Sequence, residues 1–325
     1  MTTLTGHLSL YATQSLKSID NWMNVVQGNI GGSLVTAYKQ VELNYAGGLT
    51  HEIRSTTNLK NGVMIGEQVL TTGNTRVDWK QGEVISSTQD THFAIQGDGF
   101  FLAVDPKQST LTGGYFTGQE NGVYLTRKGD FHFGKVLNAA GVNIAVAAGI
   151  TADPEETVLV NEQGMLLMAD LSDGPNLGNS DNIHIFITKT NFYNSGWGPS
   201  VVQPTYDAPN TVTIPNRIVD YDELQYSKYG SSLLKAPTST AIKTIISGAG
   251  GNYDSRTRVS PSANGENRGD YDANALLIPS ALEASNVRVE RNITELAVMG
   301  KIYNGFVQLI KVYNSNLDEV LAFIR

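Results

Sequence analysis

Cysteine is absent from this chain of 325 residues. The absence excludes disulfide bridges, thiolate metal sites and a cysteine nucleophile. Histidine is scarce, and its five copies stand singly, without the i, i+4 helical spacing of a zinc-binding pair or the neighbours of a catalytic base. These are His7, His51, His92, His132 and His184. We therefore expect no metal site and no cofactor.

Long apolar runs and excess positive charge are also missing. No stretch reaches the ~18 apolar residues of a membrane-spanning helix, and residues 1–12 lack the basic start and continuous apolar core of a cleaved secretion signal. The chain has 23 Lys and Arg against 31 Asp and Glu, a net charge of -8, whereas nucleic-acid binders carry basic patches. We expect no membrane insertion, no cleaved leader and no nucleic-acid partner.

Catalytic patterns are equally sparse. Gly97-Asp98-Gly99 lacks the third glycine of a dinucleotide loop and the lysine of a P-loop, so we interpret it as a hairpin turn. The adjacent acids Glu155 and Glu156 fit a solvated loop better than a catalytic pair. The sequence predicts a protein that is not an enzyme.

Both ends of the chain carry the apolar spacing of helices. Near the N-terminus, apolar residues recur at steps of three and four up to Ile30, and Gly31-Gly32 ends the pattern. Residues 289–324 alternate steps of four and three throughout, a heptad seam along a helix on the order of 54 Å long. We predict an assembly interface from these stripes: Leu8, Tyr11, Ile19, Trp22, Val26, Ile30, Val289, Ile293, Leu296, Tyr303, Val307, Ile310, Leu317, Leu321 and Ile324.

The partner of these stripes is left open by the residues themselves. An antiparallel hairpin between the two ends and a bundle between molecules both satisfy the pattern. Further apolar residues flank the C-terminal seam, among them Ile302, Phe306, Leu309, Val312 and Val320, and indicate more than one neighbour.

The middle of the chain has the pattern of strands. Short runs rich in β-formers, separated by Gly, Asn and Asp, favour an antiparallel β domain. The predicted fold class is α+β, with long terminal helices forming a coiled-coil-like domain around a central, mostly antiparallel all-β domain. The predicted parts are the N-terminal helix at 1–40, an extended connector at 41–75, the β domain at 76–280 with inserted loops at about 195–223 and 247–272, and the C-terminal helix at 281–325.

Several motifs resemble those of the bacterial flagellar rod and hook proteins, most closely the distal rod type. The resemblance covers most of the chain, from Asn29-Ile30 and Thr36-Ala37-Tyr38-Lys39, where Ala37 replaces the family's glycine, to the segment 282–287 before the last helix. Its motif residues are Asn29, Phe93, Gly97, Gly99, Phe100, Phe101, Thr126, Arg127, Gly129, Phe131, Ser285, Asn286 and Val287.

The resemblance implies a structural subunit that self-assembles into a hollow helical tube, with terminal helices lining the inner wall and the β domain outside. It implies that the partners are further copies of the chain and adjacent axial proteins of the basal body, rod or hook. It also implies a role in motility, and type III export to an extracellular or periplasm-spanning filament. Rod and hook remain alternatives to each other, and so does a non-flagellar surface filament or adhesin subunit of the same family.

Overall fold

The structure, a computed structural model, forms two compact units. It describes residues 3–48, 51–53, 63–65, 69–97, 99–107, 115–116, 122–138, 140–170, 184–196, 198–199, 201–206, 224–235, 240–246 and 276–324. The helical unit comprises Met1–Leu34, Lys39–Trp79 and Val287–Arg325, and the β unit comprises Val35–Tyr38 and Lys80–Asn286. The chain therefore passes between the two units four times.

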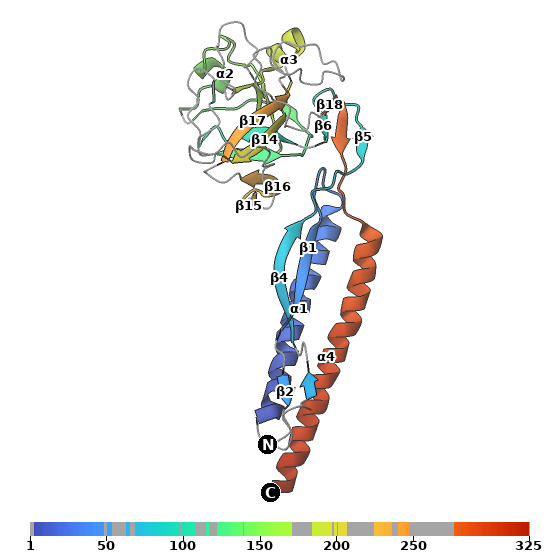
Figure 1. Cartoon of the computed structure of the whole chain (residues 1–325). Coiled ribbons are helices and arrows are strands. Elements are labelled where there is room, and N and C mark those ends of the chain that lie inside the picture. The colour runs from blue at the N-terminus through green and yellow to red at the C-terminus, as the bar shows by residue number, and fades with distance from the viewer. Residues whose placement is uncertain are drawn as a thin grey trace, which may run out of the picture. The chain divides into compact units, whose positions relative to one another are not determined.

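Two long helices run through the helical unit (Figure 1). They are α1 (Thr3–Gly32) and α4 (Val289–Ile324). The apolar spacing explains their contact, because Ile19 and Val26 of α1 and Met299 of α4 are almost fully buried in one cluster. The start of α1 and the end of α4 lie at the same end of this unit (Figure 1).

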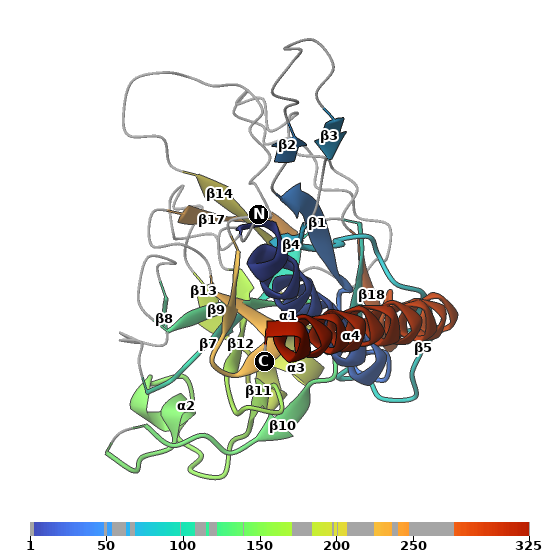
Figure 2. The ribbon, with the colours of Figure 1, turned by 90° about the horizontal axis from the view of Figure 1, so that it is seen from below.

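A long β-hairpin belongs to the same unit. It pairs β1 (Val41–Gly48) with β4 (Val69–Val77) in antiparallel register from Val41↔Val77 to Gly48↔Val69, with an irregularity between Leu43 and Tyr45. A second pair joins β2 (His51–Ile53) to β3 (Val63–Ile65). Seen along the helices, the hairpin and α4 lie along different sides of α1 (Figure 2).

The predicted fold class is wrong in how it combines helices and strands. The unit that contains the terminal helices is not a helices-only coiled coil, since α1 packs against β1 and β4 as well as against α4. The central unit is not all-β, since it contains the short helices α2 (Ile144–Ala147) and α3 (Lys189–Ser195). The chain is mostly β, with one long helix near each end. Apolar spacing did not predict the hairpin on α1, because the hydrogen bonds that help to attach it leave no periodic pattern.

Among its described residues, the β unit is built on one antiparallel sheet of 11 strands. Its main path runs β10-β11-β12-β7-β9-β16-β15, with β13, β8, β14 and β17 paired to it. The strands are β7 (Phe100–Val104), β8 (Tyr115–Phe116), β9 (Val123–Thr126), β10 (His132–Gly134), β11 (Val158–Val160), β12 (Leu166–Asp170), β13 (His184–Phe186), β14 (Val201–Tyr206), β15 (Gln225–Ser227), β16 (Gly230–Lys235) and β17 (Thr240–Ile246).

Two short ribbons complete the β unit. One pairs β5 (Val84–Ser86) with β19 (Ala281–Glu283), and the other pairs β6 (Phe93–Gln96) with β18 (Leu276–Pro279). A two-stranded ribbon is marginal by itself and needs support from other contacts. These ribbons bring residues just before α4 beside residues that follow the hairpin.

The structure describes part of one of the two predicted inserted loops and none of the other. The stretch 195–223 contains β14, which pairs with β7 and β17 in the main sheet. The stretch 247–272 lies outside the described residues.

Candidate functional site

Part of the predicted assembly interface is used inside the chain. Ile19 and Val26 are buried, and Trp22, Ile30, Leu296 and Tyr303 pack against them in the core between α1, α4 and the hairpin. Tyr11, Val307 and Ile310 are partly buried. The structure therefore pairs the two terminal helices within one molecule, the first of the two alternatives that the spacing allowed.

Four further predicted interface residues are not buried in this core. Val289, Ile293, Leu317 and Leu321 are exposed. The side chains of Leu8 and Ile324 lie outside the described residues.

A second apolar stripe runs along the solvent side of α4, which we call the outer stripe. Its six residues, with exposed fractions from 38% to 90%, are Val298, Ile302, Leu309, Val312, Val320 and Phe323. At ~100° of helix rotation per residue, the outer stripe points roughly 110° away from the residues that pack on α1. Gly305 lies on it, and a methyl group built there would meet nothing within 4 Å. The helix thus presents two apolar faces, and α1 covers one of them.

Polar side chains attach the hairpin to α1. The hydroxyl of Ser18 donates to the carbonyl oxygen of Leu70 at 2.8 Å, and that of Ser15 accepts from the Leu70 amide at 3.1 Å. The side chain of Asn29 bonds both backbone groups of Val41. Asn29 is one of the motif residues predicted from the sequence. Ser15 and Ser18 were not predicted, because a serine within a helix has no distinctive sequence pattern. The hydrogen-bonded face of α1 is therefore committed to the hairpin.

The aromatic motif residues form the core of the β unit. Phe93, Phe100, Phe101 and Phe131 are each at most 1% exposed. The Phe101 and Phe131 rings meet edge to face with centroids 5.1 Å apart. Their burial assigns them to packing.

The glycines of the motif allow close backbone approaches. Gly97 and Gly99 have φ angles of 97° and 133°, which other residues rarely adopt. A Cβ on Gly129 would lie 1.6 Å from the carbonyl oxygen of Phe93, so only glycine fits there. Thr126 accepts a hydrogen bond from the Lys128 amide at 3.0 Å, which shapes the same turn.

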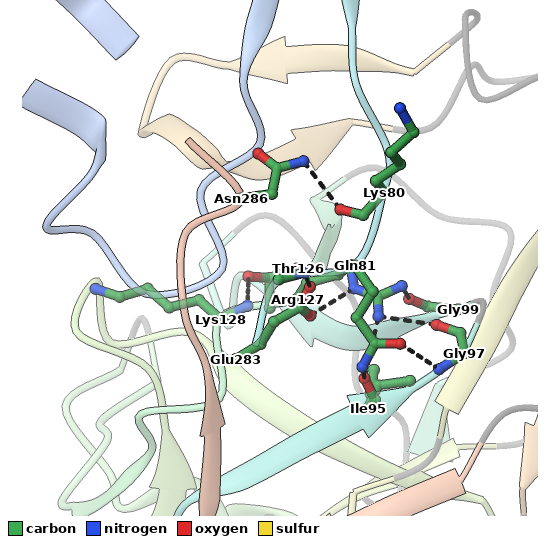
Figure 3. A network of polar contacts seen from close by, with 11 residues as sticks. Lys80, Gln81, Ile95, Gly97, Gly99, Thr126, Arg127, Lys128, Glu283 and Asn286 are labelled. Carbon is green, nitrogen blue, oxygen red and sulfur yellow. Dashed lines mark hydrogen bonds and ion pairs between the residues drawn. The ribbon is translucent and has the colours of Figure 1, made fainter. Parts of the chain in front are cut away.

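Arg127 forms a buried ion pair with Glu283, with Nε and Oε2 separated by 2.9 Å (Figure 3). Glu283 lies within the segment that resembles the family, but its role emerges only from this pairing across 156 residues. Downstream, Asn286 donates from its side chain to the carbonyl oxygen of Lys80 at 2.9 Å and from its amide to Tyr38 at 3.2 Å. With its neighbours Ser285 and Val287, it belongs to the segment that leads into α4.

A second charged group surrounds Lys128. Its Nζ lies 2.6 Å from Glu162 and 3.2 Å from Asp130. Burial raises the pKa of Asp130, whereas the hydrogen bond from Lys128 lowers the pKa of Glu162. Burial opposes the charge of Lys128, but the bonds to both carboxylates outweigh it and raise the lysine pKa. The group links Lys128 and Asp130 to Glu162.

Within the described parts of the chain, no group of three or more His, Cys, Asp or Glu side chains is placed to hold a metal ion. No described helix is both long enough and apolar enough to cross a bilayer. The feature of the described residues that most resembles a functional surface is therefore the outer stripe of α4.

Comparison with known proteins adds no assignment. No protein-family model matches the chain, and no curated protein matches it. The resemblance to the flagellar rod and hook family rests on the motifs alone and stays a hypothesis.

Proposed function

We propose that the chain is a structural subunit that assembles with copies of itself into a helical, tube-like filament, as flagellar rod and hook proteins do. The observation that carries the proposal is the outer stripe of α4. Six large apolar side chains on one helix face exceed the scattered single residues of an ordinary surface. The proposal that the assembly is a helical tube is based on the resemblance of the motifs to those of the rod and hook proteins.

The energetics favour several neighbours over a tight pair. Moving one such side chain from full exposure to full burial contributes ~1.5–3 kcal/mol, and these six are already partly covered. Association costs on the order of 4–15 kcal/mol in lost translational and rotational freedom. Burial of one stripe therefore releases only enough free energy for a weak contact. A stable assembly needs several contacts per subunit.

A repeating contact between different surfaces builds an open helix when its rotation does not close a ring. A contact in which the outer stripe of one subunit packs on a different face of the next subunit is of this repeating kind. By the same resemblance, the proposal places the filament outside the cytoplasm after type III export, next to other axial proteins.

The test is Val312→Asp, because Val312 is 60% exposed in the single chain and central in the outer stripe. A buried carboxylate at this position would oppose assembly. Gln308→Asp is the matched control, since Gln308 is exposed on the same helix and lies beside the stripe. Sedimentation velocity at rising concentration, with negative-stain microscopy, measures the outcome.

We expect filaments from the unchanged chain and from Gln308→Asp, and dispersed single molecules from Val312→Asp with an unchanged circular dichroism spectrum. If the unchanged chain stays dispersed at millimolar concentration, the proposal fails. If Val312→Asp assembles as well as the control does, the outer stripe is not the interface.

A further inference from the structure

Glu283 connects three segments of the β unit that lead to or from the helical unit. Its carboxylate bonds Arg127 and accepts the Gly82 amide at 2.9 Å. Its backbone oxygen accepts the Ala37 amide at 2.8 Å. Ala37 follows α1, Gly82 follows β4, and Glu283 precedes α4. One residue, fully buried, therefore joins all three connecting segments. Figure 3 shows its contact with Arg127.

Arg127 is held in place by the turn between β6 and β7. Its Nη2 donates to the carbonyl oxygens of Ile95 and Gly97 at 3.1 and 2.8 Å, and its Nη1 donates to Gly99 at 3.1 Å. The guanidinium is planar and its donors are set at fixed angles, so these bonds fix its orientation toward Glu283. The ion pair thus links the connecting segments to the edge of the folded core.

The same segments contain strained backbone. Ala37 and Ser280, with φ angles of 54° and 51°, are the non-glycine residues in the left-handed region among those described. That conformation is unfavourable for residues with a Cβ, and it persists only where surrounding contacts hold it. Ala37 is held by Glu283, and Ser280 by the Ser87 amide, which donates to its carbonyl oxygen at 2.7 Å.

Close backbone contacts help to hold these segments together. A Cβ on Gly82 would lie 1.9 Å from the carbonyl oxygen of Ala284. The Ala284 amide donates to Glu83 at 2.7 Å, and Ile85 in the ribbon opposite β19 is 46% exposed. The segments therefore depend on these polar contacts in addition to the burial of Ala37, Tyr38 and Ala281.

We infer that the Arg127–Glu283 pair is a clasp: when it breaks, residues 35–38, 80–86 and 280–286 open together as one local unit while the main sheet stays folded. Removing one partner of a buried ion pair leaves the other charged and unpaired, which is strongly unfavourable. Strain in Ala37 and Ser280 favours the open state once the clasp is lost. The parts of the chain that connect its two units would then change conformation separately from the β core.

Hydrogen exchange on the full chain tests the clasp with Glu283→Gln, which keeps the side-chain shape and removes the charge. We expect the amides of Ala37, Gly82 and Ala284 to exchange at least about tenfold faster, by similar factors. The amides of β7, β9 and β12 should keep their rates. Glu295→Gln is the matched control, because the Arg291–Glu295 pair has the same 2.9 Å separation but is much less buried, with Arg291 exposed and Glu295 partly exposed.

Two further variants keep the inference falsifiable. Arg127→Lys retains the charge but cannot reach all three carbonyls. It replaces Glu283→Gln as the test variant if Glu283→Gln does not fold, and it should accelerate exchange of the same three amides by a smaller factor. Adding Ala37→Gly to Glu283→Gln relieves the strain and should slow the opening again. Equal acceleration of the sheet amides, or independent rates in the three segments, would overturn the clasp.

Discussion

Asn29 binds the backbone of Val41 at two points: its Nδ2 donates to the carbonyl oxygen at 2.8 Å, and its Oδ1 accepts from the amide at 2.9 Å. The side chain, 1% exposed, takes the place of a neighbouring strand at the start of β1. Because its amide supplies both a donor and an acceptor, no apolar residue can replace it here.

We expect Asn29→Ala to lower the free energy of unfolding of the helical unit by about 1–3 kcal/mol, since two backbone groups lose their partner. Asn24→Ala is the control, because Asn24 is exposed on the same helix and alanine favours helix formation. Urea denaturation followed by circular dichroism measures the free energy of unfolding of both variants. Equal effects of the two substitutions would contradict the role of Asn29.

Ala37 occupies a position where the backbone favours glycine. Its φ of 54° is unfavourable for a residue with a Cβ by ~1–2 kcal/mol. We expect Ala37→Gly to raise stability by up to about 1 kcal/mol. The same substitution at Ala297, exposed in α4, should lower it by about 1 kcal/mol. Thermal denaturation that gives both changes the same sign would refute this interpretation.

The phenolic oxygen of Tyr45 is buried without a hydrogen-bond partner among the described residues, while its ring packs against Trp22 with centroids 4.8 Å apart. Tyr45→Phe keeps the ring contact and removes the unpaired hydroxyl. Urea denaturation near pH 7 should therefore give equal or higher stability. A loss of more than about 1 kcal/mol would indicate a partner for the hydroxyl.

The same tyrosine predicts a pH dependence. Burial, and then the charge of Glu295, raise the pKa of Tyr45 above its ordinary value near 10. The stability that depends on the neutral phenol is fully present below pH ~10 and is lost as pH rises above it, because the unfolded chain ionises first. Tyr45→Phe should make this alkaline loss smaller.

Ile310 lies on the inner face of α4, in line with Tyr303, and not on the outer stripe. It is partly buried, so Ile310→Asp should destabilise the single molecule by about 1–2 kcal/mol, in addition to any effect on assembly. Val312→Asp should leave the single molecule unchanged. Thermal melting of dilute samples compares them, and equal melting temperatures would mean that α4 is rotated from its place here.

Gly305 gives a prediction in which stability and assembly move in opposite directions. A methyl group there meets nothing in the single chain, so Gly305→Ala should stabilise the helix by up to about 1 kcal/mol. If a neighbouring subunit approaches the outer stripe closely, the same methyl group should weaken assembly. Melting and sedimentation together measure both effects, and stronger assembly would argue against close approach at Gly305.

The terminal helices and several strands could be predicted from the sequence because their signals are local. The apolar steps at 8–30 and 289–324 fall within α1 and α4, and the β-rich runs around Phe93, Phe100 and Val123 fall within β6, β7 and β9. Each pattern depends on residues only a few positions apart, so it can be recognised from the sequence without knowledge of the fold.

Only the tertiary structure decided which faces meet and which polar groups pair. Ser18 and Leu70 are 52 residues apart, and Arg127 and Glu283 are 156 apart. A hydrogen bond or ion pair between such residues leaves no periodic trace in the chain, because one polar side chain among apolar neighbours could equally face solvent. The hairpin on α1 and the clasp therefore depend on long-range geometry, whereas the period of the helices depends on local steric constraints alone.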